Sequence, residues 1–226
     1  MSASRVVSSA GVTGGSDERI LRYSLWERVV HWAAAVTYIY NLITGLAFWS
    51  PYMFWAVVIV GGGAAARFWH PWVGLVFAVT LFCQHRMWRR DMATTEADRK
   101  WSRVMESYIR NEDEKLPPTG RFNFGQKLFF WAMWYGIIGL LLSGVVMWFN
   151  EAIPWSLRGV RYLAVAVHVI AAFVTIGGFI VHVYMSTALV RGSFTAMIGG
   201  EASPQWARRH HGLWYDEAVR GGPAKK

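Results

Sequence analysis

Five of the seven histidines in this chain lie within or at the ends of long apolar segments: His31, His70, His85, His168 and His182. Ionisable side chains are expensive in such surroundings and usually serve a function. His168 and His182 are 14 residues apart in one segment. At 100° per residue this spacing is within about 40° of four whole helical turns, with a rise of about 21 Å. Both imidazoles should therefore project from one face of one helix, at two depths.

Each depth also receives a histidine from another apolar segment, His70 at the level of His168 and His31 at the level of His182. Two pairs of imidazoles at two levels of a helical bundle match the ligands of two stacked bis-histidine haems. The single cysteine, Cys83, excludes a covalent CxxCH haem site and an iron–sulfur cluster held by this chain alone. The haems should therefore be of the b type.

Other interpretations of the histidines remain open at this point. His85 also lies at the inner level, beside Arg86, so three candidates compete for two inner ligand positions. Any one histidine in a membrane helix more often bonds a polar neighbour than a metal. Structural zinc is a weaker alternative, because it usually needs four N or S ligands at one level.

The apolar segments that would position these histidines predict four membrane-spanning helices, at about 29–49, 67–86, 126–148 and 160–190, since about 20 apolar residues cross a bilayer. The apolar stretch 54–66 is too short to span and is predicted as a loop or interfacial piece. Pro71 is expected in the first turn of the second helix. The fold class is thus an all-α, integral membrane four-helix bundle.

The basic residues lie between the apolar segments rather than along a nucleic-acid-binding face, although the net charge is +9. With four spans, 20 Lys and Arg residues lie on the side of both termini and 3 on the other side. The positive-inside rule then places both termini in the cytoplasm. The prediction is a multi-pass membrane protein in contact with lipid, and no nucleic acid partner.

The predicted membrane domain covers residues 23–190, and the two chain ends lie outside it. Residues 1–22 are rich in Ser and Gly, lack the apolar core of a signal peptide, and are predicted as a poorly ordered extension. Residues 191–226 form a basic cytoplasmic tail. Its Arg208–Tyr215 segment is typical of a solvated end attracted to anionic lipid.

A weak internal repeat ends the first and third predicted helices: Thr44-Gly45-Leu46-Ala47-Phe48-Trp49 and Ser143-Gly144-Val145-Val146-Met147-Trp148. Each copy places a glycine in the later part of a helix. The missing side chain lets a neighbouring helix or a flat cofactor approach closely. Ordinary helix packing explains the repeat equally well.

Several short motifs resemble the cytochrome b (gamma) subunit of respiratory, membrane-bound formate dehydrogenases, over about residues 22–217. The motifs are Glu27-Arg28-Val29-Val30-His31-Trp32, His70-Pro71-Trp72-Val73-Gly74, Asn123-Phe124-Gly125-Gln126-Lys127, His168, His182-Val183-Tyr184-Met185, Gly192-Ser193, Met197-Ile198, Trp206-Ala207-Arg208-Arg209-His210-His211 and Trp214-Tyr215. Cytochromes b of hydrogenases share the helix histidines, whereas the NxGQK motif and the basic tail favour the formate dehydrogenase branch.

This resemblance implies the ligand set. His31 and His182 would bind the cytoplasmic-side haem, His70 and His168 the outer haem, and His85 would have a surface role. The family's quinone pocket carries over onto Asn123, Gly125, Gln126 and His182. Asn123 also suits a helix N-cap. Arg67, Arg158 and Arg161 could pair with propionates of the outer haem, although snorkelling to the interface is the simpler interpretation for Arg158.

The resemblance also implies partners: an iron–sulfur subunit and a molybdenum- or tungsten-containing catalytic subunit. It offers a second interpretation of the Arg208–Tyr215 segment, which would dock against the membrane anchor of the iron–sulfur subunit or against the inner surface of the bundle. Electrons would pass through two haems b to menaquinone or ubiquinone in a bacterial inner membrane, and formate would be oxidised elsewhere in the complex. The alternatives are the cytochrome b of a hydrogenase or another molybdoenzyme and, in a different class, a haem-free membrane anchor or transporter.

Overall fold

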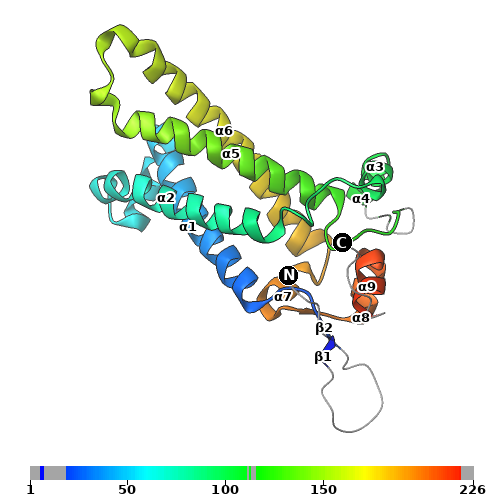
Figure 1. Ribbon diagram of the computed structural model, residues 1–226. Coiled ribbons are helices and arrows are strands. Elements are labelled where there is room, and N and C mark those ends of the chain that lie inside the picture. Colours follow the sequence, from blue (N-terminus) through cyan, green and yellow to red (C-terminus); the bar gives the residue numbers. More distant parts are fainter. Residues whose placement is uncertain (1–5, 8–18, 111, 113–115, 220–226) are drawn as a thin grey trace. The chain divides into compact units, whose positions relative to one another are not determined.

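The computed structural model describes residues 6–7, 19–110, 112 and 116–219 (Figure 1). Within these residues, four helices are long and apolar enough to cross a membrane. They are α1 (Leu25–Trp49), α2 (Gly63–Trp88), α5 (Phe124–Trp148) and α6 (Arg158–Tyr184), which continues as a short π-helix, η5 (Met185–Leu189). The four predicted spans are confirmed. Of the stretch 54–66, predicted as a loop or interfacial piece, residues 54–60 lie in the 3-10 helix η1 (Pro51–Val60), whereas residues 63–66 belong to α2.

The long helices begin earlier than hydropathy predicts, and a capping side chain explains this for α1. Ser24 and Glu27 bond each other's backbone N–H groups and side chains ahead of α1, and this reciprocal arrangement is a capping box. α2 begins at Gly63, where Ala64–Ala66 favour helix. Pro71 consequently lies inside α2, and the prediction that it stands in the first turn is wrong.

The remaining elements are short. They are β1 (Val6–Val7), β2 (Arg19–Leu21), α3 (Glu96–Ser102), α4 (Met105–Ile109), η3 (Asn150–Ala152), η4 (Trp155–Leu157), α7 (Ser193–Gly199), β3 (Glu201–Ala202), α8 (Pro204–His210) and α9 (Gly212–Val219). The chain divides into two compact units. We call residues 29–87 and 131–180 the helical unit, and the described residues of 1–28, 88–130 and 181–226 the end unit.

Tyr38 joins three helices inside the helical unit. Its ring packs against Phe77 of α2 and Phe179 of α6, with centroids 5.3 and 5.0 Å away, and its hydroxyl donates to Thr175 of α6. Gly136 brings α5 against the same threonine, since a Cβ there would lie 2.5 Å from the Thr175 Cγ2. Figure 1 shows α5 and α6 side by side. Small residues that permit close approach are the usual device of membrane helix packing.

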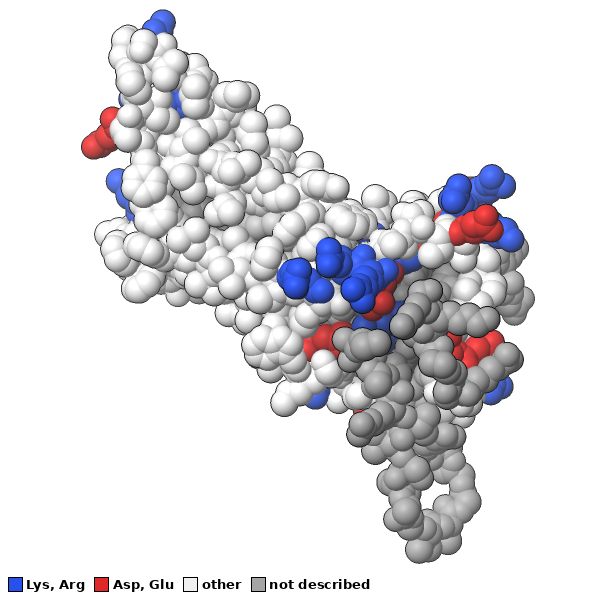
Figure 2. Space-filling model, viewed as in Figure 1, with Lys and Arg blue, Asp and Glu red and all other residues white. Residues whose placement is uncertain are grey.

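The long helices turn apolar side chains outward. In the most apolar window of each span, only 11–22% of the residues are buried within the chain. On the face seen in Figure 2, these helices present a surface almost free of Lys, Arg, Asp and Glu. Exposed apolar area on this scale is far more than a soluble protein carries, and it fits a lipid environment.

The end unit contains a small antiparallel sheet of strand order β1-β2-β3, which the sequence analysis did not predict. Ile20 of β2 pairs with Ala202 of β3 and is 1% exposed. It packs in one apolar cluster with Ala207 and Trp214 of the tail helices. Residues 19–22, assigned above to the poorly ordered extension, are therefore folded, and 1–5 and 8–18 lie outside the described residues.

The described part of the basic tail docks on its own chain rather than standing as a solvated end. His211 is 1% exposed; its Nδ1–H donates to the carbonyl of Gly120, and its Nε2 accepts from Arg22. This tautomer follows because a guanidinium only donates and a carbonyl only accepts. The Arg22 guanidinium also lies over the rings of Trp206 and Trp214, at 4.9 and 5.0 Å. Docking within the end unit thus replaces the interpretation as a solvated tail.

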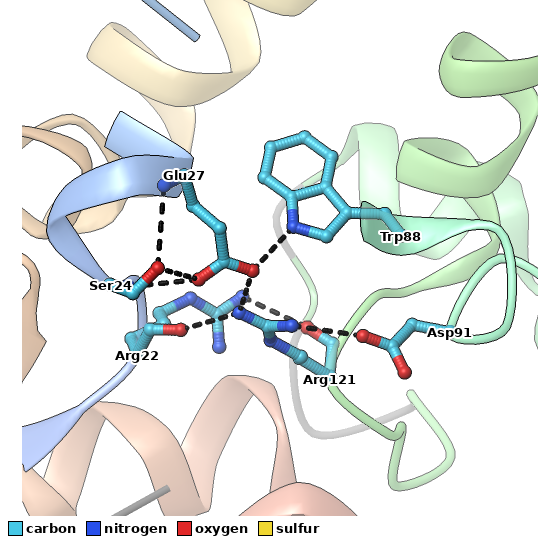
Figure 3. A network of polar contacts seen from close by, with 6 residues as sticks. All are labelled: Arg22, Ser24, Glu27, Trp88, Asp91 and Arg121. Carbon is cyan, nitrogen blue, oxygen red and sulfur yellow. Dashed lines mark hydrogen bonds and ion pairs between the residues drawn. The ribbon is translucent and has the colours of Figure 1, made fainter. Parts of the chain in front are cut away.

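A buried carboxylate organises the start of α1 (Figure 3). Glu27 is 4% exposed and accepts hydrogen bonds from the Trp88 indole at 2.6 Å and from Arg121 at 2.8 Å. Arg121 also pairs with Asp91 at 2.9 Å and donates to the carbonyl of Arg22. Burial would lower the pKa of Arg121, but Glu27 and Asp91 raise it above its ordinary value. The charges of Glu27 and Arg121 can thus be buried because each has a partner of opposite charge.

We expect the Arg121→Met variant to destabilise the end unit by about 3 kcal/mol, because it leaves the Glu27 carboxylate buried without its cation. The Arg110→Met variant is the matched control, since the Arg110–Glu106 pair is mostly exposed and such pairs contribute at most about 1 kcal/mol. Native-state proteolysis of the purified protein in detergent measures both. Equal resistance of the two variants would contradict the assigned role of Arg121.

Tail docking should weaken in acid. Burial, followed by the neighbouring charges of Arg22 and His210, holds the pKa of His211 well below its ordinary value, although the bond to Gly120 opposes this. The undocked tail then binds more protons than the docked tail below the ordinary histidine pKa of about 6.5. Docking stability is thus constant above that pH and falls below it.

The measurement is hydrogen exchange of residues 204–219 between pH 5 and 8, corrected for the intrinsic exchange rate. Protection should fall as the pH drops below about 6.5. The His211→Gln variant keeps a side chain of hydrogen-bonding character without a titrating group, and it should flatten the dependence. The same acid loss in His211→Gln would assign the effect to another group.

Candidate functional site

Two histidines of the helical unit face each other from different helices. His70 of α2 and His168 of α6 have ring centroids 6.5 Å apart, with ring planes inclined at 54°. The sequence analysis placed these residues at one depth on separate helices, and the structure brings them together.

A hydroxyl group contacts each of these rings at Nδ1. The Thr44 Oγ1 of α1 lies 2.6 Å from the Nδ1 of His70, and the Ser143 Oγ of α5 lies 3.0 Å from the Nδ1 of His168. Thr44 is fully buried and Ser143 is 4% exposed. Because Nδ1 of each imidazole has a partner, Nε2 is the nitrogen that each ring can offer to a metal.

The two glycines of the internal repeat contact the same rings. A Cβ on Gly45 would lie 3.6 Å from the Cε1 of His70, and one on Gly144 would lie 3.3 Å from the Cε1 of His168. A histidine ring is therefore the neighbour of each glycine, and at Gly144 the absence of a side chain gives that ring needed space.

The pair fits the two axial positions of a haem iron. Two metal–imidazole bonds of about 2 Å, with about 1 Å from each nitrogen to its ring centroid, put the centroids about 6 Å apart. The 6.5 Å spacing agrees with this. Within the described residues no group of three or more His, Cys, Asp or Glu side chains is arranged to hold a metal ion.

The other candidate ligands are distributed over both units. His31 of α1 belongs to the helical unit and His182 of α6 to the end unit, and their pairing stays a prediction. The ring of His182 stacks on Phe129 at 4.5 Å with 3° between the planes. His85 stacks on Trp134 at 4.0 Å, and this aromatic contact is compatible with the non-ligand role that the resemblance implies.

Two of the three arginines at the predicted outer ends have contacts within the chain. Arg161 donates to the carbonyl of Ile153, and its Nε is buried with no hydrogen-bond partner among the described residues. Arg158 lies over the ring of Trp155 at 5.1 Å, a contact that suits interfacial snorkelling. Pairing of Arg67 or Arg161 with a propionate stays a prediction.

Asn123 and Gln126 start α5 and also line a pocket in the end unit. The Oδ1 of Asn123 accepts from the backbone N–H of Gln126, and the Oε1 of Gln126 accepts from that of Asn123. The N-cap interpretation of Asn123 is thus confirmed. The pocket has a volume of about 200 Å³ and is also lined by Trp101 and by tail residues 208–211.

The structure does not bring all four predicted quinone residues into this pocket. Gly125 and His182 are absent from its lining as described. Gly125 instead lies under the cap, where a Cβ would be 3.5 Å from the Asn123 Oδ1 and 3.7 Å from the Trp101 ring. Both distances are ordinary van der Waals contacts, so Gly125 adjoins two lining residues without being one of those described.

Sequence reasoning missed the hydroxyls of Thr44 and Ser143, although the repeat that contains them was recognised. The repeat had been interpreted only through its glycines, Gly45 and Gly144. The available signal was a hydroxyl residue before each glycine, 26 and 25 residues ahead of His70 and His168. The contribution of the tail to the pocket was missed as well, because it depends on contacts far apart in the sequence.

Comparison with known proteins agrees with this geometry. The model of the family described as prokaryotic cytochrome b561 matches residues 22–200. The formate dehydrogenase cytochrome b556(fdo) subunit of Escherichia coli K12 is 36% identical over 211 residues, covering 92% of this chain and 97% of that protein. The nitrate-inducible cytochrome b556(Fdn) subunit of the same organism is 29% identical over 210 residues, covering 92% and 94%.

The formate dehydrogenase cytochrome b556 subunit of Haemophilus influenzae is 29% identical over 205 residues, covering 90% of this chain and 85% of that protein. The similarity thus extends through almost the whole of both chains, including all four membrane helices. It confirms the resemblance drawn from the motifs, and it removes the haem-free alternative, since the family consists of b-type cytochromes. The chain belongs to the prokaryotic cytochrome b561 family and is a membrane-embedded electron-transfer protein of haem b type.

Proposed function

We propose that this chain is the di-haem cytochrome b subunit of a membrane-bound formate dehydrogenase. It would take electrons from an iron–sulfur subunit, whose own source is a molybdenum- or tungsten-containing subunit, and deliver them to quinone. The observation that carries the proposal is the His70–His168 pair at 6.5 Å, with both Nδ1 atoms on hydroxyls. The names of the relatives support the assignment to formate dehydrogenase.

The outer haem would be held by His70 and His168, and the inner haem by His31 and His182. Bound haem supplies reversible one-electron chemistry at iron. The chain's own contribution is to hold neutral imidazoles at fixed positions in an apolar bundle and to exclude water with lipid-facing helices. A rise of about 21 Å between His168 and His182 on one helix sets the distance that electrons cover.

The pocket at the start of α5 is the proposed quinone site. The Oε1 of the Gln126 side chain accepts a backbone N–H group, so the NH₂ group of this amide lies on its other branch. An NH₂ group donates, and a quinone carbonyl accepts. Trp101, which is 1% exposed, adds an aromatic side chain to the lining of the same pocket. Quinone reduction takes up two electrons and two protons and gives quinol.

The predicted topology would let electron transfer from the haems to quinone store energy in the membrane potential. With both termini in the cytoplasm, the pocket lies at the cytoplasmic level, and formate would be oxidised on the other side of an inner membrane. Electrons moving inward through the haems meet protons from the cytoplasm. Full transfer of one charge works against the membrane potential by about 2.3 kcal/mol per 100 mV.

The cytochrome b of a hydrogenase or another molybdoenzyme is the second candidate, because the matching family model is broader than formate dehydrogenase. The experiment that separates the two is identification of the large subunit that co-purifies with the chain. A formate-oxidising partner supports the proposal, and a nickel–iron hydrogenase partner overturns its substrate assignment.

Haem content tests the ligand assignment. We expect two haems b per chain by the pyridine haemochrome assay. The His70→Ala and His168→Ala variants should each lose the outer haem and keep the inner one, and His31→Ala and His182→Ala the reverse, because each removes one of two axial bonds. The His85→Ala variant is the matched control and should keep both. Loss of a haem in His85→Ala would show that His85 is a ligand of the inner haem and that the assignment above is wrong.

Quinone turnover tests the pocket. In the intact complex the Gln126→Leu variant should reduce formate-dependent quinone reduction at least tenfold, while formate still reduces both haems. The substitution also removes a capping bond worth about 1 kcal/mol. The Thr95→Ala variant controls for this, because Thr95 forms the capping box of α3 and is not a lining residue. Unchanged quinone turnover in Gln126→Leu, with haem content confirmed, would place the quinone site elsewhere.

A further inference from the structure

The hydroxyl of Thr44 has three neighbours within hydrogen-bond distance. They are the backbone carbonyls of Tyr40 at 2.9 Å and Asn41 at 3.2 Å, and the Nδ1 of His70 at 2.6 Å. A hydroxyl has one proton to donate, and a carbonyl can only accept. All these contacts are satisfied together when Thr44 donates to the backbone and accepts from a protonated Nδ1 of His70.

Ser143 repeats the arrangement on the other side of the pair. Its hydroxyl donates to the carbonyls of Gly139 or Leu140, and the Nδ1 of His168 lies 3.0 Å from the same oxygen. Again the imidazole is the donor. In both rings the Nε2 is then the nitrogen without a proton, which is the form that ligates iron.

We propose that Thr44 and Ser143 are positioning residues that hold His70 and His168 in the metal-binding tautomer and orientation, and make both imidazoles stronger donors to iron. This inference rests on the proposed function, because it needs a haem between these two histidines. A ligating histidine commonly donates its second N–H to a carboxylate, a carbonyl or water, which fixes its tautomer and raises its basicity. In this chain the acceptor would be a hydroxyl that itself donates to a backbone carbonyl of its own helix.

The glycines of the repeat lie beside the two rings. A Cβ added at Gly45 would lie 3.6 Å from the Cε1 of His70, and one added at Gly144 would lie 3.3 Å from the Cε1 of His168. The first distance is an ordinary van der Waals contact and the second is tighter, so Gly144 is the glycine that restricts the space beside its ring.

Ordinary helix back-bonding is the competing explanation for these hydroxyls, and the chain supplies matched controls for it. Thr37 of α1 donates to the carbonyls of Ala33 and Ala34, and Thr80 of α2 to that of Phe77. Neither has an imidazole contact among those described. If back-bonding alone matters, the Thr37→Val and Thr80→Val variants should resemble the Thr44→Val variant.

The experiment uses the intact complex and compares Thr44→Val and Ser143→Ala with Thr37→Val and Thr80→Val. The readouts are the low-spin electron paramagnetic resonance signal and the midpoint potential of the outer haem, together with haem content. Removing a hydroxyl should weaken ferric haem binding about tenfold, which is the lower end for loss of such a partner. If the loss is confined to the ferric form, the midpoint potential rises by about 59 mV.

Support requires a changed outer-haem signal and a raised potential in Thr44→Val and Ser143→Ala, with parental behaviour in the two control variants. Thr44→Ser and Ser143→Thr keep a hydroxyl and should restore the parental signal, which also separates a lost hydrogen bond from misfolding. Parental signals in Thr44→Val and Ser143→Ala, or equal shifts in the controls, overturn the inference. Retention of the outer haem in His70→Ala would instead overturn the proposed function on which it rests.

Discussion

An imidazole that binds a metal among apolar helices has two nitrogens with opposite requirements. One must give up its proton to leave a lone pair for the metal, and the other must keep its proton and find an acceptor, since an unsatisfied polar group is costly there. In the helical unit the acceptors are Thr44 and Ser143. This requirement fixes much of the packing: α1 must lie against the His70 end of α2, and α5 against the His168 end of α6.

The end unit meets a different constraint, the burial of charge. Arg22, Glu27 and Lys127 are all less than a tenth exposed, and isolated charges would not be tolerated there. Glu27 and Lys127 have partners of opposite charge, Arg121 for Glu27 and Asp98 for Lys127 at 2.7 Å. Arg22 has no such partner among the described contacts and instead donates to the neutral imidazole of His211.

The Lys127–Asp98 pair also keeps its carboxylate charged. Burial would raise the pKa of Asp98, but the hydrogen bonds from Lys127 and from its capping partner Thr95 lower it below its ordinary value. The carboxylate is thus held ionised at the foot of α5, where that helix begins. The Lys127–Asp98 ion pair in this way fixes α3 to the start of α5, whose Asn123 and Gln126 line the pocket.

The sequence predicts those features that depend on local pattern. Hydropathy is enough for the four spans, and helical periodicity with charge topology is enough to pair His70 with His168. Helix starts were predicted late, because capping by Ser24 and Asn123 is a matter of single side chains rather than of apolar content. The docking of Arg22 with His211 joins residues 189 apart, and no local pattern encodes such a contact.

The internal repeat shows how a site can come from two similar hairpins. In each, the first helix carries a hydroxyl residue followed by glycine, and the second carries a histidine 26 or 25 residues later. The first hairpin is α1 with α2, and the second is α5 with α6. Each supplies one complete unit, a ring with its acceptor and its small neighbour, and the facing of two such units produces the 6.5 Å pair.

The similarity of the hairpins does not extend to the inner level. The proposed inner ligands are His31, on the first helix of one hairpin, and His182, on the second helix of the other. The position of α5 that contacts His182 is Phe129, whose ring stacks on the imidazole. On α2, His85 is stacked on Trp134. The proposed inner level thus differs from the outer one in the helices that provide its ligands. Two haems held in such different ways would be tuned by different side chains, and unequal tuning can set a direction for electrons along one helix.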